Sequence, residues 1–149
     1  MREDVINLQL RDADVREIYA GTALSAKEVL SRSVDESSHT WVIKHDNNII
    51  GVFGVNCNFT TKSGVVWLLG TQGLDKIKLT FTKYSPLVID RMLFIDGIDV
   101  IFNYVSVYHE EAIKWLKWCG FEFMGSEVYM MSPDIPFVQF YKWRDNINV

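Results

Sequence analysis

The sequence has few cysteines and histidines, no excess of basic residues and no long apolar run. Its two cysteines, Cys57 and Cys119, lie far apart and form no metal-binding or redox spacing, which is typical of reduced core thiols. The three histidines are equally scattered, so we expect no metal site. A net charge of −4 disfavours a nucleic-acid-binding protein, because such a protein usually needs a basic face.

The apolar residues are spread along the chain. None of the apolar runs approaches the roughly 20 residues that a membrane-spanning helix requires, and the opening MREDVINLQL lacks the apolar core of a secretory signal. We therefore expect a soluble protein of the cell interior, without a membrane span. The 149 residues include nine Phe and five Trp, which is enough bulky apolar material to build a core. We expect one domain over residues 1–149.

The first third of the chain reads as a strand followed by two helices. Val5–Leu10 alternates between apolar and polar residues, which predicts a strand. Asp12 and Asp14 are the expected caps of the next helix, whose expected buried stripe is Val15, Ile18, Tyr19 and Thr22. Ser25 is the expected N-cap of a second helix, in which Ala26, Val29 and Leu30 face inward.

A hairpin and a buried strand follow. The strand Thr40–Lys44, the turn Asp46–Asn48 and the strand Ile49–Phe59 form the hairpin pattern. Val65–Leu69 is a continuous apolar run, as expected for a strand with both faces covered.

A long helix follows the turn Gly70–Lys76. Its expected buried face is Ile77, Phe81, Tyr84, Val88 and Met92. Pro86 removes a backbone donor in its middle, so we expect the helix to kink or restart near Ser85.

The last third predicts a strand, a short helix and further strands. Val100–Val107 is the strand, and Ala112, Ile113, Leu116 and Cys119 form one apolar helix face. Gly120 stands where a helix needs a residue with positive φ to finish. Phe121 and Phe123 share a face of the next strand, and two more strands are expected at Glu127–Met131 and Phe137–Trp143. Residues Asn146–Val149 are expected to fray.

The short helix and its exit resemble the last motif of the GNAT superfamily of N-acetyltransferases. Ala112 and Gly120–Phe121 hold the spacing of that motif. His109 stands where the family usually has Asn, and Leu116 stands where many members have a Tyr that serves as general acid. The resemblance implies an α/β (α+β) fold, in which helices cover both faces of a mixed, mostly antiparallel sheet of six or seven strands. It also implies that the central strands separate after Leu69.

From Val66 onward the chain is similar to the small GNAT-like proteins of short-tailed bacteriophages, some of which are internal virion proteins. The VWLLG run, the FNYVSV strand and the Trp-rich helix carry this similarity. It implies a protein of the host cytoplasm or of the virion.

In the family, the turn after the central strand binds the pyrophosphate of acetyl-coenzyme A. The residues that the resemblance assigns to this role here are Leu69, Gly70, Thr71, Gln72, Gly73 and Lys76. The family's glycine pattern is incomplete, because the glycine position counted from Gln72 holds Asp75, whose carboxylate would repel a pyrophosphate. The alternative is that the glycines only make a strand-to-helix turn, which Asp75 caps.

Acetyl transfer needs a base for the amine and an acid for the departing thiolate. Because Leu116 leaves the family's acid position vacant, the candidate catalytic residues are Tyr108 and His109. The alternatives are that Tyr108 packs and that His109 is the residue at the helix start.

Two functions therefore stay open. The first is a phage GNAT-fold protein with degenerate acetyl-CoA motifs, which acts through contacts with a phage or host protein in virion assembly or host takeover. The second is an active acetyl-CoA-dependent N-acetyltransferase that acts on an amine of a small molecule or protein. Trp115 and Trp118 bear on this choice, because an exposed Trp would mark a contact surface.

Overall fold

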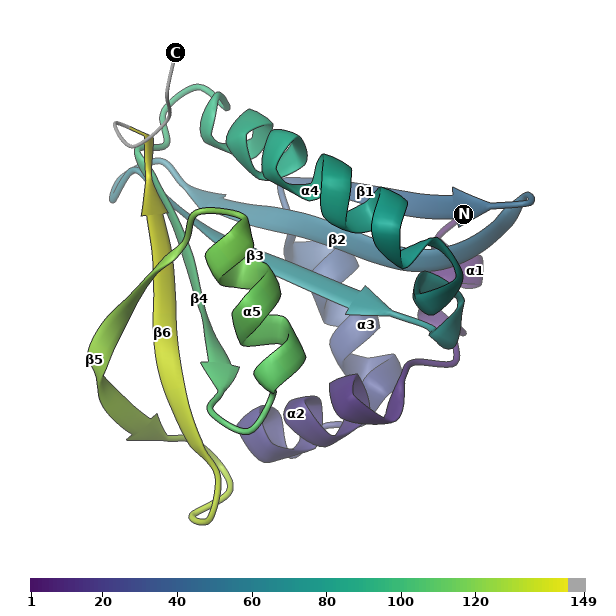
Figure 1. Ribbon diagram of the computed structural model, residues 1–149, viewed down its shortest axis with the longest axis horizontal. Helices are drawn as coiled ribbons and strands as arrows, with labels where there is room; N and C mark the ends of the chain where they lie inside the picture. The colour runs from purple at the N-terminus through teal and green to yellow at the C-terminus, as the bar shows by residue number, and fades with distance from the viewer. Residues whose placement is uncertain (145–149) are drawn as a thin grey trace.

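A computed structural model describes residues 1–144 (Figure 1). The elements in chain order are α1 (Arg2–Ile6), α2 (Asp12–Thr22), α3 (Ala26–Glu36), β1 (His39–His45), β2 (Asn48–Asn58), β3 (Ser63–Gly70), the 3-10 helix η1 (Gln72–Ile77), α4 (Lys78–Leu93), β4 (Val100–Ser106), α5 (Glu110–Trp118), β5 (Glu122–Tyr129) and β6 (Pro136–Trp143). No helix among the described residues is long and apolar enough to cross a bilayer.

The strands form one six-stranded sheet in the order β1-β2-β3-β4-β6-β5. All neighbours are antiparallel except β3 and β4, which are parallel. Helices α4 and α5 cover one face of the sheet, and α1, α2 and α3 lie on the other side (Figure 1). The predicted mixed, mostly antiparallel α/β architecture is confirmed.

The two parallel central strands separate soon after they meet. They pair only from Ser63 opposite Val100 to Val65 opposite Phe102, and beyond that point they diverge (Figure 1). The separation was expected after Leu69 and begins earlier. At the fork the Asn103 side chain donates to the Val66 carbonyl at 2.6 Å. This amide supplies a partner to β3 backbone that no longer pairs with β4, as buried carbonyl groups require.

Two apolar clusters hold the layers together. The larger lies between the sheet and the α4–α5 layer and includes Leu93, Ile101 and Leu116. The smaller joins Val5 of α1 and Leu30 of α3 to Val52 of β2. Burial of such side chains stabilises each by about 1.5–3 kcal/mol relative to exposure.

The beginning of the chain differs from its predicted structure. Val5–Leu10 was expected to be a strand, but Val5 and Ile6 belong to α1. Both side chains are buried, and Val5 packs in the cluster that contains Leu30. No strand of the described sheet pairs with this segment. The alternation of apolar and polar residues predicted a strand, in which only every second residue would face the core. The consecutive residues Val5 and Ile6 are both buried, which the end of a helix allows.

The buried faces of α2 and α4 also differ from the predicted stripes. On α2, Val15 and Tyr19 are exposed, whereas Ile18 is buried as expected. On α4 the buried residues are Ser85, Ile89, Met92 and Leu93. Met92 is thus buried as expected, whereas Tyr84 and Val88 are exposed and their neighbours Ser85 and Ile89 are buried in their place.

Near the C-terminus, the structure has one strand where the sequence predicts two. The strand expected at Phe121–Phe123 and the one expected from Glu127 merge into β5. The pairing of β5 with β6 shifts register between Phe123 and Glu127, so the interruption in the sequence pattern is an irregularity within one strand. The segment Asn146–Val149 lies outside the described residues.

Pro86 stands inside α4, which neither ends nor restarts there. Proline has no N–H, so the Thr82 carbonyl one turn earlier loses its helical donor. The Trp118 indole N–H of α5 donates to this carbonyl at 2.9 Å. Trp118 is largely exposed, but its indole N–H replaces the donor that Pro86 lacks. The same hydrogen bond joins α5 to α4.

We predict that this hydrogen bond is coupled to the proline. Trp118→Phe should lower the free energy of unfolding by about 1 kcal/mol, the usual net value of one hydrogen bond. In a Pro86→Ala background the new N–H can serve Thr82, so the same change should cost clearly less. Urea denaturation of the two single variants and the double variant measures the coupling. Equal costs of Trp118→Phe in both backgrounds would show that the indole N–H contributes nothing.

Candidate functional site

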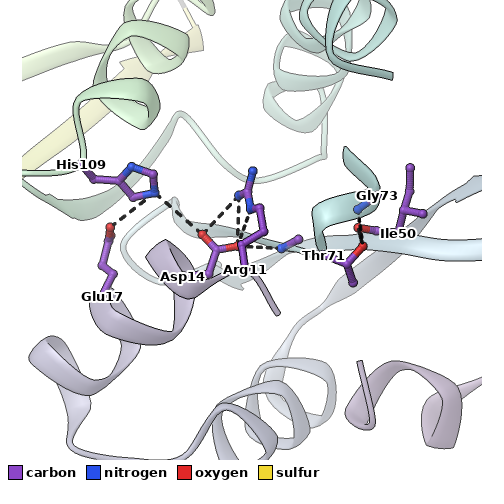
Figure 2. A network of polar contacts seen from close by, with 8 residues as sticks. Arg11, Asp14, Glu17, Ile50, Thr71, Gly73 and His109 are labelled. Carbon is purple, nitrogen blue, oxygen red and sulfur yellow. Dashed lines mark hydrogen bonds and ion pairs between the residues drawn. The ribbon is translucent and has the colours of Figure 1, made fainter. Parts of the chain in front are cut away.

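The turn between β3 and α4 is organised by Thr71. Its N–H donates to the Ile50 carbonyl at 2.9 Å. Its hydroxyl accepts the Gly73 N–H at 3.1 Å, and its carbonyl accepts the Leu74 N–H at 3.2 Å. The N–H groups of Thr71, Gly73 and Leu74 therefore have partners inside the protein, and Figure 2 shows the contacts of Thr71 with Gly73 and Ile50.

The two glycines of this turn are required by close packing. A Cβ atom on Gly70 would overlap the Leu74 side chain, which is buried. A Cβ atom on Gly73 would overlap the side chain of Ile50. The side chains of Gln72 and Lys76 are exposed beside them. Pyrophosphate recognition needs unpaired N–H groups, and this turn already pairs those of Gly70, Thr71, Gly73 and Leu74, so only its remaining N–H groups could serve the group.

The Asp14 carboxylate is the centre of a polar cluster next to this turn (Figure 2). It accepts the Gly70 N–H at 2.9 Å, and it receives hydrogen bonds of 3.0–3.2 Å from the Arg11 guanidinium. The backbone N–H of Arg11 donates to the Gly70 carbonyl at 2.9 Å. Burial would raise the pKa of Asp14, but His109, Arg11 and the Gly70 N–H outweigh it, so the pKa is lowered and the group is ionised.

His109 and Glu17 complete the cluster. His109 is the N-cap residue of α5, as one of its predicted alternatives states, but its side chain makes no cap hydrogen bond. Its Nε2 lies 3.8 Å from Asp14 Oδ1 and 4.0 Å from Glu17 Oε2 (Figure 2). The Asp14 carboxylate raises the pKa of His109, burial opposes this, and Glu17 adds to the rise.

Glu17 is the most perturbed carboxyl of the cluster. Its Oε2 atom is buried and has no hydrogen-bond partner within residues 1–144. Burial raises the pKa of Glu17 to about 7, with His109 opposing and Asp14 adding to the shift. A carboxyl with a pKa near neutrality is suited to exchange a proton with a ligand.

A cavity of about 250 Å³ opens beside Glu17 and His109. Its lining consists of Ala13, Arg16, Glu17, Ala20, Ser106, Tyr108, His109 and Ile135. Both predicted catalytic residues, Tyr108 and His109, are thus brought to one cavity, whereas the predicted cofactor-binding residues of the turn are not in its lining. Leu116, at the family's acid position, is buried in the core.

Sequence reasoning missed Asp14 and Glu17 as site residues. Asp14 was expected to cap α2, but the N-cap position is Arg11 and Asp14 lies inside the helix, buried. Its spacing of four from the buried Ile18 places it on the inward face, and a carboxylate there is the signal that identifies it. Among the described residues no group of His, Cys, Asp or Glu has the arrangement of a metal site.

No protein-family model and no curated protein sequence matches the chain. Among solved structures, smu.2055 from Streptococcus mutans UA159 is 11% identical over 96% of this chain and 93% of that chain, with a TM-score of 0.71. Spermidine N-acetyltransferase from Vibrio cholerae, solved with CoA and spermine, is 16% identical over 97% of this chain and 90% of that chain, with a TM-score of 0.66.

A chimera of the Vibrio cholerae spermidine N-acetyltransferase SpeG with hSSAT gives 17% identity over 80% of this chain and 75% of that chain, with a TM-score of 0.61. At such identities the likeness concerns the fold alone. The chain has the GNAT fold, and the predicted fold is confirmed.

We predict that Glu17 makes stability depend on pH. Its folded pKa of about 7 lies above its ordinary value, so its contribution is complete below about 4.5 and is lost as pH rises through 7. The raised pKa of His109 acts in the same direction above its ordinary 6.5. The free energy of unfolding should fall by about 2 kcal/mol from pH 5 to pH 8.

Glu17→Gln should remove most of this slope between pH 5 and 7. Glu36→Gln, on the exposed end of α3, is the matched control and should leave the slope unchanged. Urea denaturation at each pH measures both variants. If Glu17→Gln kept the slope of the unaltered protein, the perturbed carboxyl would lie elsewhere.

Proposed function

We propose that the protein is an N-acetyltransferase that acts on an amine bound in the cavity beside Glu17. The single observation that supports this most is Glu17, whose buried Oε2 has no hydrogen-bond partner within residues 1–144 and which lines a cavity together with Tyr108 and His109. A bound amine would supply the missing partner. The fold agrees, because one neighbour of the same fold is an N-acetyltransferase that was solved with CoA.

The residues of the cavity take different roles in the proton transfers that accompany acetyl transfer. An ammonium group must lose a proton before its nitrogen can attack an acyl carbon, and the Glu17 carboxylate takes that proton. Its pKa of about 7 allows it to accept and release the proton near neutral pH. His109 lies between Glu17 and the ionised Asp14, so it is a positioning residue that stabilises the carboxylate form of Glu17. The exposed hydroxyl of Tyr108 is the candidate acid.

The second candidate function is a GNAT-fold protein without acetyl transfer, which acts by contact with a phage or host protein in virion assembly or host takeover. It would work in the host cytoplasm or in the virion. The observation in its favour is the turn after β3, where the N–H groups of Gly70, Thr71, Gly73 and Leu74 all have internal partners. The exposed apolar residues Tyr84, Leu87 and Phe94 on or next to α4 offer such a partner a surface.

Binding of coenzyme A and acetyl transfer separate the two candidates. If coenzyme A binds, at about 100 times its dissociation constant it should raise the free energy of unfolding by about 2.7 kcal/mol, visible as a thermal shift. Acetyl-CoA with a panel of amines should then release free thiol, and Glu17→Gln should slow this release by about 100-fold, the usual contribution of a general base.

Glu36→Gln serves again as the matched control and should retain the full rate. Tyr108→Phe tests the candidate acid, with an expected loss of about the same order. Absence of both a thermal shift and thiol release at millimolar coenzyme A would overturn the acetyltransferase proposal in favour of the second candidate. An undiminished rate in Glu17→Gln would keep the activity but remove Glu17 from the mechanism.

A further inference from the structure

Arg16 gives the cavity a positive group next to its carboxyl. It follows directly before Glu17 on α2, and both residues line the cavity. The Arg16 side chain is exposed and takes part in none of the ion pairs between residues 1–144. Arg11, one turn earlier, is by contrast held by Asp14. The cavity thus presents a cation without an ion-pair partner among residues 1–144, next to a carboxyl whose ion-pair contact is with His109.

The charges around the cavity are otherwise balanced or positive. His109 lines the same cavity beside Asp14 and Glu17, and the Asp14 carboxylate raises its pKa, which favours the positively charged form of the ring. Asp14 is ionised, but it is paired with Arg11 and lies outside the lining. Glu17 is therefore the one acidic group in the lining, against Arg16 and His109. A ligand with several positive charges would meet more repulsion than attraction.

Apart from Ser106, the rest of the lining is apolar or aromatic. Ala13 and Ala20 are small residues on the same helix, and Ile135 comes from the loop before β6. Tyr108 adds its ring. At about 250 Å³ the cavity is smaller than the roughly 300–1,000 Å³ typical of pockets for drug-sized ligands. It therefore favours a compact ligand with an apolar part.

We propose that the amine bound here is a free amino acid with a compact apolar side chain, whose ammonium group meets Glu17 and whose carboxylate meets Arg16. This deepens the proposed function, on which it rests, because it names the substrate class of the same cavity. A guanidinium binds a carboxylate through two parallel hydrogen bonds, which gives orientation as well as attraction. The proposal separates this chain from its structural neighbours named as spermidine N-acetyltransferases, since Arg16 and His109 disfavour a polyamine.

Calorimetric titration of the whole chain with L-leucine, L-leucinamide and spermidine, in the absence of coenzyme A, tests the proposal. L-leucine should bind most tightly, because only it carries the carboxylate. Arg16→Gln should weaken L-leucine by about tenfold or more, as expected for loss of a charged hydrogen-bonding pair, and should leave L-leucinamide unchanged. Arg16→Lys should recover part of the loss. Arg32→Gln on α3 removes the same charge outside the cavity and should change nothing.

The proposal is overturned if spermidine or L-leucinamide binds as tightly as L-leucine, if Arg16→Gln leaves L-leucine unaffected, or if none of the three probes binds at millimolar concentration. Its failure is distinct from that of the proposed function. Acetyl transfer to spermidine but not to L-leucine would refute the amino-acid proposal alone. Arg16-dependent binding of L-leucine without any acetyl transfer would refute the acetyltransferase proposal alone.

Discussion

One buried carboxylate, that of Asp14, connects the parts of the molecule that surround the candidate site. It accepts hydrogen bonds from the Gly70 N–H at the end of β3 and from the Arg11 guanidinium at the start of α2. It also faces His109 at the start of α5. A carboxylate taken out of water must keep its partners, because removing one from a buried pair typically costs about 3–5 kcal/mol. The relative positions of α2, β3 and α5 are therefore constrained together, and the cavity beside Glu17 depends on that constraint.

The same contacts give the two sides of the site different characters. On the side of the turn after β3, Asp14 and Thr71 occupy N–H groups that would otherwise be available to an anion. On the side of α2, they leave Glu17 and Arg16 bordering an open cavity. A GNAT fold therefore does not by itself settle the chemistry, since the fold positions the site and the individual side chains decide what it recognises.

Irregular backbone in this protein is completed by side chains that are distant in the sequence. Asn103 serves the Val66 carbonyl where the central strands part, and Trp118 serves the Thr82 carbonyl that Pro86 leaves without a donor. Without the Asn103 amide or the Trp118 indole, the corresponding carbonyl would have no hydrogen-bond donor. The two side chains therefore allow the strands to diverge and α4 to contain a proline within the same fold.

The sequence alone determined those features whose causes are local. The hairpin of β1 and β2 follows from alternation and from Asp46 and Asn47, which adopt the positive φ that a tight turn needs. The N-terminus of α3 follows from the reciprocal Ser25–Glu28 capping box, and the end of α5 from Gly120 at φ 89°.

Tertiary structure decided the rest. The helical form of Val5 and Ile6, the buried face of α4 and the convergence of Asp14, Glu17 and His109 depend on which surfaces meet. A propensity is a property of neighbouring residues, whereas the burial and the pKa of a side chain are set by groups far along the chain.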